Sequence, residues 1–318
     1  MNRAVFDETT TNGRGASEGV TIPGPALYGK LPSGYRLPDA TRLGSIVLQV
    51  ADLTRSVSYY EQVIGLRVLD RSGGSTALAV EDSGEPLLEL RERLGARPVP
   101  RSGRLGLYHF AILLPDRAAL GRFAAHLGGI GAGVGMADHL VSEALYLTDP
   151  DGLGIEVYAD RPRTAWRTRG RELVMRTDPL DVEDLVAAGA GARWTGAPAG
   201  TVLGHIHLHV SSLEEAAAFY HRGLGFDEIV WSYPGALFLS AGGYHHHLGV
   251  NTWARGAAPA GPDDARLVEW EILLPAPADA ADALASVAAV GASVEQTPEG
   301  GVTRDPWGVA VRLRAAGA

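Results

Sequence analysis

Three histidines alternate with apolar residues in the stretch Gly204-His205-Ile206-His207-Leu208-His209-Val210. An alternation with a period of two is typical of a β-strand, so the three imidazoles share one face and the apolar side chains share the other. Imidazole is both a metal ligand and a proton carrier near neutral pH. We therefore expect this strand to supply one ligand to a mononuclear metal centre. The alternative is a strand whose polar side simply faces solvent.

The composition limits what else could bind a metal. The chain has 318 residues, of which 46% are hydrophobic and 20% charged, as in a globular protein of about two domains. It contains no cysteine, so disulfides, thiolate metal sites and a cysteine nucleophile are excluded. Any metal must be held by His, Asp or Glu. The net charge of -9, without a basic block, makes nucleic acid an unexpected partner.

The N-terminal segment carries no sign of export. Its opening residues, MNRAVFDETTTNGRG, lack the apolar centre of a signal peptide, and the chain has no run of about 18 apolar residues that could span a membrane. We expect a cytoplasmic protein that does not enter the membrane. Residues 1–41 are rich in Gly, Pro, Thr and Ser without periodicity, and are predicted to form an N-terminal arm.

The rest of the chain repeats one order of elements, a strand, a helix and then further strands, in four modules. The first has a strand at 43–50, a helix at 56–63 and strands at 66–71, 76–80 and 86–91; the second has a strand at 107–114, a helix at 117–127 and strands at 143–148 and 154–158. The third has a strand from His205, a helix at 213–221 and strands at 236–240 and 245–252; the fourth has a strand at 269–274, a helix at 279–290 and a strand at 309–313.

The two halves of the chain are related by a nearly constant offset. Counterparts lie 160 residues apart at Val50 and Val210, Leu53 and Leu213, Tyr60 and Tyr220, and Gly65 and Gly225. Such agreement indicates an internal duplication. The predicted fold is α+β: four βαβββ modules in two halves, 42–160 and 203–318, joined by a connector at 161–202. We expect the modules to pair into curved mixed sheets that enclose a metal cavity.

Superposing the four modules shows where ligands could converge. The first strands carry Ser45, His109, His205 and Glu269 at equivalent positions, and the last strands of modules two and four carry Glu156 and Arg312. If modules two and three pack together, His109, Glu156 and His205 meet as two imidazoles and one carboxylate, the facial triad of non-heme Fe(II) oxygenases. If the modules pair in chain order instead, His205 is left alone. We favour the first packing, in which Glu269 and Arg312 form an ion pair.

Several longer motifs resemble those of the vicinal oxygen chelate superfamily, and most closely its catechol 2,3-dioxygenase branch, the extradiol ring-cleaving enzymes. The resemblance runs from about residue 42 to the C-terminus. It rests on the segments 106–115 (GLYHFAILLP), 142–146 (SEALY), 149–152 (DPDG), 204–208 (GHIHL) and 242–247 (GGYHHH).

The resemblance implies a metal and its ligands. Extradiol enzymes hold iron with two histidines and one glutamate, which His109, Glu156 and His205 match. Fe(II) is therefore the implied cofactor, with Mn(II) as the alternative metal. Many members of the branch take their ligands from modules three and four, whereas module four of this chain lacks them.

The resemblance also implies catalytic residues around the metal. These enzymes place a further histidine on the last strand of the module that gives the first ligand; His246 fits this place, with His245 and His247 as alternatives. They also use a tyrosine ten residues before the glutamate ligand, which Tyr146 matches. A histidine precedes that tyrosine in the family, and His139 is the candidate here.

The implied function is extradiol ring cleavage of a catechol-type aromatic diol by dioxygen, with the diol and O2 as partners and a homo-oligomer possible. The alternatives are a glyoxalase-like metal isomerase or a hydroquinone-type dioxygenase of the same fold, and a metal-free protein that binds an aromatic drug. Candidates for an apolar wall around the substrate ring are Trp231, Leu237, Phe238 and Trp253.

Overall fold

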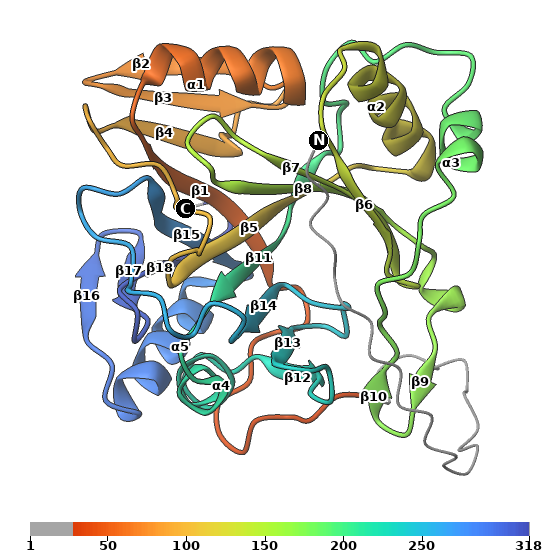
Figure 1. The fold of residues 1–318 in the computed structure, drawn as a ribbon. Helices are drawn as coiled ribbons and strands as arrows, with labels where there is room; N and C mark the ends of the chain where they lie inside the picture. The colour runs from red at the N-terminus through yellow and green to blue at the C-terminus, as the bar shows by residue number, and fades with distance from the viewer. Residues whose placement is uncertain (1–27, 318) are drawn as a thin grey trace.

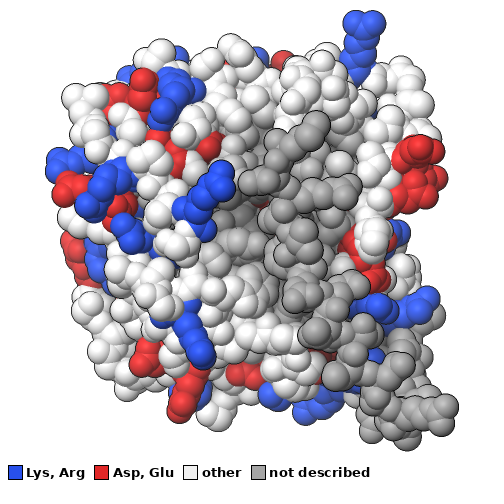
Figure 2. Space-filling model, viewed as in Figure 1, with Lys and Arg blue, Asp and Glu red and all other residues white. Residues whose placement is uncertain are grey.

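The computed structural model describes residues 28–317. Most of the predicted N-terminal arm therefore lies outside the described residues. In the described part of the arm, Leu37 N donates a hydrogen bond to Gly225 O (2.9 Å), and the backbone of Lys30 pairs with that of Glu228. Among residues 28–317, no helix is both long and apolar enough to cross a membrane. Positive and negative side chains are interspersed on the face shown in Figure 2.

The first half of the chain and the connector contain the following elements. Module one comprises β1 (Arg42–Val50), α1 (Leu53–Tyr59), η1 (Tyr60–Ile64), β2 (Arg67–Ser72), β3 (Ser75–Ala79) and β4 (Leu88–Glu92). Module two comprises β5 (Gly106–Leu113), α2 (Arg117–Gly129), β6 (Gly135–Asp138), β7 (Ser142–Thr148) and β8 (Gly154–Asp160). The connector forms η2 (Arg163–Ala165), β9 (Thr168–Arg169), β10 (Glu172–Leu173) and α3 (Val182–Ala188).

The second half repeats the same order. Module three comprises β11 (Val202–His209), α4 (Leu213–Ala216), η3 (Ala217–Gly223), β12 (Asp227–Val230), β13 (Ala236–Ser240) and β14 (Leu248–Asn251). Module four comprises β15 (Arg266–Leu274), α5 (Pro277–Ala289), β16 (Val294–Thr297), β17 (Gly300–Arg304) and β18 (Ala310–Ala315).

The modules pair into two eight-stranded, curved mixed sheets (Figure 1). One sheet has the order β12-β13-β14-β11-β5-β8-β7-β6 and joins modules two and three; the other has the order β16-β17-β18-β15-β1-β4-β3-β2 and joins modules one and four. The central strands of each sheet, β5 with β11 and β1 with β15, are antiparallel. The predicted α+β fold class is confirmed. The division into halves at residues 160 and 203 stays a prediction, because each sheet takes one module from each half.

The strand β11 is buried on both of its faces. Ile206 and Leu208 are fully buried in a hydrophobic core that also contains residues of the helices and of both sheets. On the other face, His205 and His207 are only 1% and 4% exposed. The alternative of a solvent-facing histidine strand is therefore wrong. An alternating pattern sets which residues share a face, whereas the packing of the other elements decides whether that face meets water.

Two equivalent hydrogen bonds tie the two sheets together. Tyr60 Oη donates to Asp149 Oδ2 (3.1 Å), and Tyr220 Oη donates to Asp305 Oδ2 (2.8 Å). Each bond joins the helical segment of one module to the turn before the last strand of the next module. Burial raises the pKa of both carboxyl groups to about 6.

Several boundaries differ from those expected. The helices after β1 and β11 finish in π-helical turns, η1 and η3, instead of running as regular helices. The strand expected from residue 245 begins only at Leu248, so the three histidines before it lie in a loop. The strands β6, β16 and β17, of four or five residues, have no expected counterpart; pairing with a neighbouring strand defines them.

Two β-bulges interrupt the pairing of β5 with β11. The register shifts once at Gly204 and once at Tyr108, each one residue before a histidine of the predicted metal site. The pairing of β1 with β15 shifts at the equivalent places, at residues 44–45 and at Val268. Bulges are known to redirect side chains next to functional sites. Here a bulge allows Tyr108 and His109, which are neighbours in the chain, to have ring centroids only 4.8 Å apart.

Gly204 has no room for a side chain, which generates a prediction about stability. A Cβ atom at this position would lie 1.9 Å from Tyr158 Oη, and Tyr158 is fully buried. We expect Gly204→Ala to lower the free energy of unfolding by about 3 kcal/mol, because a packed interior resists added volume. Gly84→Ala is the control, since a Cβ there meets no atom within 4 Å. Denaturant unfolding checks the prediction, and equal stabilities of the two variants would contradict it.

Candidate metal centre

Three side chains from neighbouring strands of one sheet meet in the interior: His109 of β5, Glu156 of β8 and His205 of β11. His109 Nε2 lies 3.3 Å from His205 Nε2 and 3.0 Å from Glu156 Oε2. His205 Nε2 lies 3.1 Å from the same carboxylate oxygen. All three residues are at most 5% exposed. The pairing of modules two and three thus brings the three predicted ligands together, as expected from the sequence.

The strand register explains why these three side chains converge. Ala111 of β5 lies opposite Glu156 on one side and opposite His205 on the other. His109 lies two residues before Ala111 and therefore on the same face of β5. The methyl group of Ala111 is small, so the longer side chains of its two neighbours can lean across it toward His109. A large residue at position 111 would fill this space.

The spacing of the three donor atoms fits one divalent cation. Two donors about 2.1 Å from one ion lie about 3.0 Å apart when they are at right angles, and about 4.2 Å apart when they are opposite each other. The observed separations of 3.3, 3.0 and 3.1 Å match the first case. The donors can therefore occupy one face of an octahedron, as in the triad of two histidines and one carboxylate that leaves open positions.

The charges of the site also favour a cation. Burial raises the pKa of Glu156, but the two imidazoles beside it outweigh this effect and hold the pKa well below its usual value. Burial lowers the pKa of His205 to about 4, although Glu156 opposes the shift. The site therefore presents an ionised carboxylate and a neutral imidazole, which are the protonation states that coordinate a metal.

Tyr146 and His139 form a hydrogen-bonded pair beside the triad. Tyr146 lies directly opposite Glu156 in the β7–β8 hairpin, and its ring centroid is 5.6 Å from that of His109. His139 Nδ1 lies 2.6 Å from the carbonyl oxygen of Arg176, and His139 Nε2 lies 2.6 Å from Tyr146 Oη. A carbonyl oxygen only accepts, so a neutral His139 donates from Nδ1 and accepts the Tyr146 hydroxyl proton at Nε2.

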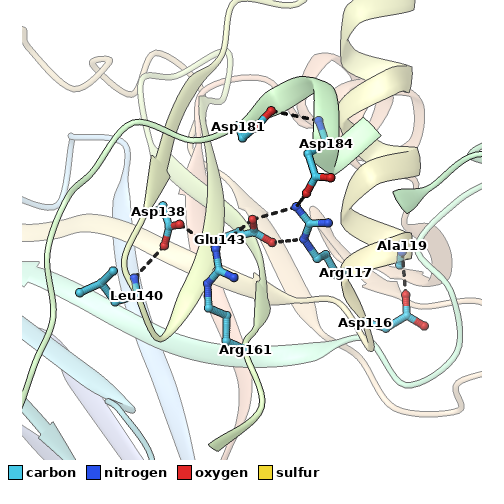
Figure 3. Close-up of polar contacts among 9 residues, drawn as sticks. All are labelled: Asp116, Arg117, Ala119, Asp138, Leu140, Glu143, Arg161, Asp181 and Asp184. Carbon is cyan, nitrogen blue, oxygen red and sulfur yellow. Dashed lines mark hydrogen bonds and ion pairs between the residues drawn. The ribbon is translucent and has the colours of Figure 1, made fainter. Parts of the chain in front are cut away.

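The turn that carries His139 is held by an ion-pair network (Figure 3). Asp138 Oδ1 accepts a hydrogen bond from Leu140 N (2.8 Å), which supports the positive φ of 67° at Leu140. Arg161 binds Asp138 Oδ2 (2.7 Å) and Glu143 Oε1 (3.1 Å). This network is not predictable from the sequence, because an isolated charged residue in a strand carries no signal of its partner.

The same network anchors the connector. Arg117, at the start of α2, binds the buried Glu143 (2.5 Å) and also Asp184 of α3 (2.8 Å), as Figure 3 shows. The connector backbone also pairs with this turn, since Asp138 and Asp178 exchange two backbone hydrogen bonds of 2.9 Å. The connector is therefore part of the structure around His139, and is more than a link between the two halves.

The three consecutive histidines before β14 have different surroundings. The ring centroid of His246 lies 4.1 Å from that of His205, the predicted ligand. His245 is fully buried and faces Asp160, with 2.8 Å between Nε2 and Oδ1. His247 Nδ1 lies 2.9 Å from Ser240 Oγ. Of the three alternatives, His246 makes the closest ring contact with the triad; its catalytic role stays a prediction.

An aromatic group lines the next part of the same sheet face. The ring centroid of Tyr108 lies 4.6 Å from that of His209 and 5.6 Å from that of Trp253. Asn251 binds two of the histidines of β11, with Nδ2 3.0 Å from His207 Nε2 and Oδ1 2.7 Å from His209 Nδ1. Tyr108 is not predictable as part of this group from the sequence, because regular alternation would place it on the face opposite His109.

The four candidates for the substrate wall separate into two groups. The ring centroids of Phe238 and His246 are 5.0 Å apart, and those of Trp253 and His207 are 5.7 Å apart. Leu237 instead belongs to the main hydrophobic core. Trp231 makes a cation–π contact with Lys30, whose Nζ lies 4.0 Å from the centroid of the Trp231 ring. A cavity of about 690 Å³, lined by residues that include Leu140, Met175 and Tyr233, contains none of the four candidates in its lining; its link to the first group is Tyr233, whose ring centroid lies 5.6 Å from that of Phe238.

In the second sheet, the positions equivalent to the three proposed ligands carry no histidine. Arg312 forms a two-pronged ion pair with Glu269, at 2.6 and 3.0 Å, so the predicted ion pair is confirmed. A parallel pair joins Arg314 to Glu271 at 2.5 and 3.3 Å. These side chains line a cavity of about 850 Å³. Within residues 28–317, the only cluster of His, Asp and Glu with metal-binding spacing is the one in the first sheet.

Comparison with known proteins shows the family of the chain. Residues 42–157 and 202–313 match the model of the Glyoxalase/Bleomycin resistance protein/Dioxygenase superfamily. The chain is 46% identical over 270 residues to a protein named catechol-2,3-dioxygenase from Bacillus subtilis (strain 168), which covers 84% of this chain and 94% of that protein. The resemblance inferred from the sequence motifs is therefore confirmed.

Solved structures share the fold at lower sequence identity. A protein from Bacillus subtilis subsp. subtilis strain 168 superposes with a TM-score of 0.62 at 15% identity, over 89% of this chain and 87% of that one. Glyoxalase I from Zea mays superposes with a TM-score of 0.52 at 18% identity, over 87% and 92% of the two chains. The chain belongs to the Glyoxalase/Bleomycin resistance protein/Dioxygenase superfamily.

Proposed function

We propose that this enzyme opens the ring of a catechol-type aromatic diol with dioxygen, next to the hydroxyl-bearing carbons, at a mononuclear Fe(II) centre. The observation that carries the proposal is the convergence of His109, Glu156 and His205 with mutual separations of 3.0–3.3 Å. The 46% identity to a catechol-2,3-dioxygenase supports the substrate class.

The proposed metal ligands are His109, Glu156 and His205. When bound, Fe(II) would supply Lewis acidity toward the diol and electrons for dioxygen chemistry. Three protein ligands leave positions for small molecules, because the facial arrangement uses only one side of the ion. With one carboxylate and two imidazoles that are neutral when they coordinate, a bound divalent cation would keep a net positive charge, which attracts an anionic diol.

Tyr146 and His139 would orient the diol. Burial raises the pKa of Tyr146 well above 10, and the nearby Glu156 adds to this shift, so the hydroxyl stays neutral. Because that hydroxyl donates to His139 Nε2, its oxygen is free to accept a hydrogen bond from a substrate hydroxyl. The carbonyl oxygen of Arg176 keeps the imidazole of His139 in the orientation that this requires.

His246 would move protons during the reaction. It lies against His205, whereas Tyr146 lies against His109, so two polar groups flank the triad. An imidazole can take a proton from a substrate hydroxyl and return one when the ring opens. Phe238, which lies against His246, would hold the apolar face of the ring.

The remaining proposals concern partners and location. A small aromatic diol and O2 are the expected partners, and the cytoplasm is the expected compartment. A single chain contributes all three ligands from modules two and three, so a homo-oligomer is not required to complete the centre.

Removing the carboxylate tests the metal centre. We expect Glu156→Gln to weaken metal retention by more than about 100-fold, because a neutral amide replaces the one anionic ligand. Glu269→Gln is the matched control in the second sheet; it breaks a partly exposed ion pair and should cost less than about 1 kcal/mol in stability while keeping the metal. Elemental analysis after dialysis gives the readout. Normal metal content in the Glu156 variant would rule out this ligand set.

Oxygen consumption tests the reaction. Protein loaded anaerobically with Fe(II) should consume one O2 per catechol and form a yellow ring-opened product. Removal of the iron by a chelator should stop both, and fresh Fe(II) should restore them. An iron-loaded protein without oxygen uptake would instead favour a metal isomerase, and a protein that binds no metal would favour the drug-binding alternative.

Two substitutions test the proposed roles of the flanking residues. We expect His246→Gln to lower kcat by about 10²–10⁴-fold, the usual contribution of general acid–base catalysis, with iron content unchanged. Tyr146→Phe should lower kcat/KM about tenfold through the loss of one hydrogen bond. His126→Gln, on helix α2, is the control and should behave as wild type. Wild-type kcat in the His246 variant would remove that residue from the mechanism.

A further inference from the structure

A line of hydrogen bonds runs from His246 to the protein surface, and the mechanism above does not use it. His246 Nδ1 lies 2.7 Å from His245 Nδ1, and His245 Nε2 lies 2.8 Å from Asp160 Oδ1. The side chain of His245 is fully buried, whereas that of Asp160, at the end of β8, is 28% exposed. The three residues come from two modules and meet only because modules two and three share a sheet.

The donor and acceptor properties of the three side chains determine which atom donates in each hydrogen bond of this line. An ionised carboxylate only accepts hydrogen bonds, so His245 donates Nε2–H to Asp160. A neutral His245 then has a bare Nδ1, and the bond between the two rings requires His246 to donate Nδ1–H. A neutral His246 with its proton on Nδ1 has a bare Nε2. Among the described residues, Nε2 of His246 has no hydrogen-bond partner, so it is free for a substrate.

Two tyrosines keep Asp160 in the role of acceptor. Tyr244 Oη donates to Asp160 Oδ1 (3.2 Å), and Tyr158 Oη lies 2.6 Å from Tyr244 Oη. Burial raises the pKa of both phenols well above 10, so both stay protonated donors. Oδ1 therefore receives one hydrogen bond from Tyr244 and one from His245. This arrangement disfavours rotation of the carboxylate away from the imidazole.

His245 lies beside the proposed acid–base group and near a proposed metal ligand. Its ring centroid lies 4.7 Å from that of His246 and 6.3 Å from that of His205, the proposed metal ligand. A proton held on Nε2 by Asp160 leaves Nδ1 of His245 as the acceptor on the side of His246.

We propose that Asp160 and His245 are positioning residues that hold His246 with its proton on Nδ1 and with a bare Nε2 ready to accept the proton of the diol. The inference rests on the proposed function, because it takes His246 as the acid–base group. In the step, the O–H bond of the diol breaks and an N–H bond forms at Nε2. The imidazolium keeps its Nδ1–H bond to His245, whose partner Asp160 supplies the compensating negative charge.

Imidazole nitrogen NMR tests the arrangement without any turnover. The probe is the full chain, labelled with ¹⁵N-histidine and loaded with diamagnetic Zn²⁺. We expect the wild-type protein to show His246 protonated on Nδ1 and His245 protonated on Nε2; the variants His245→Gln and His246→Gln assign the signals. In Asp160→Asn, the amide can donate to His245 Nε2, so both rings should populate the opposite tautomer. Asp70→Asn, an exposed change in β2, is the matched control and should leave both signals unchanged.

Kinetics of the Fe(II)-loaded variants test the consequence for the reaction. We expect Asp160→Asn to lower kcat by about 10²-fold or more, with KM changed less than about twofold, since a wrong tautomer blocks proton transfer and leaves binding intact. Asp160→Glu should recover part of the loss, because it restores an acceptor.

The outcomes separate this inference from the proposed function. A wild-type His246 protonated on Nε2, or tautomers and kcat that do not respond to Asp160→Asn, would overturn the positioning role even in an active dioxygenase. Wild-type protein that shows the expected tautomers but no oxygen uptake with catechol would overturn the proposed function, and the positioning role with it.

Discussion

The antiparallel pairing of β5 with β11 is the interaction on which the centre depends. These strands come from modules two and three, on opposite sides of the connector, and no ligand set exists until they pair. The register then decides the chemistry, because Ala111 lies opposite both Glu156 and His205. A shift of one residue would turn each ligand to the opposite face of the sheet.

The protein builds the same sheet twice and gives the two copies different electrostatics. In one sheet, the carboxylate of Glu156, whose pKa is held well below its usual value, meets the imidazole of His205, whose pKa burial lowers, and this donor set can be balanced by a cation. In the other, the arginines Arg312 and Arg314 balance Glu269 and Glu271 directly, so nothing remains for a metal to neutralise. A duplicated fold can therefore keep its architecture in both copies while only one of them retains the donors for metal chemistry.

The groups around the triad are held by contacts that cross module boundaries. The connector supplies the carbonyl oxygen of Arg176, which orients His139, and module two supplies Asp160, which faces His245 of module three. The position of each imidazole thus depends on a partner distant in sequence. The stability of the sheet pairing and the contact of Asp160 with His245 are consequently linked, because modules two and three meet through the shared sheet.

The sequence by itself determined the features that depend on local spacing and on composition. The alternation of β11, the repeated modules and the absence of thiolate ligands are of this kind, because each follows from neighbouring residues or from residue counts. Tyr146 is implied by the family resemblance, and the structure places it opposite Glu156. Only the tertiary structure decided which modules pair, that the imidazole face of β11 is buried like its apolar face, and that His245 faces Asp160 while His246 faces the triad. These features join residues many positions apart, and a pattern along the chain carries no record of which distant side chain will lie beside it.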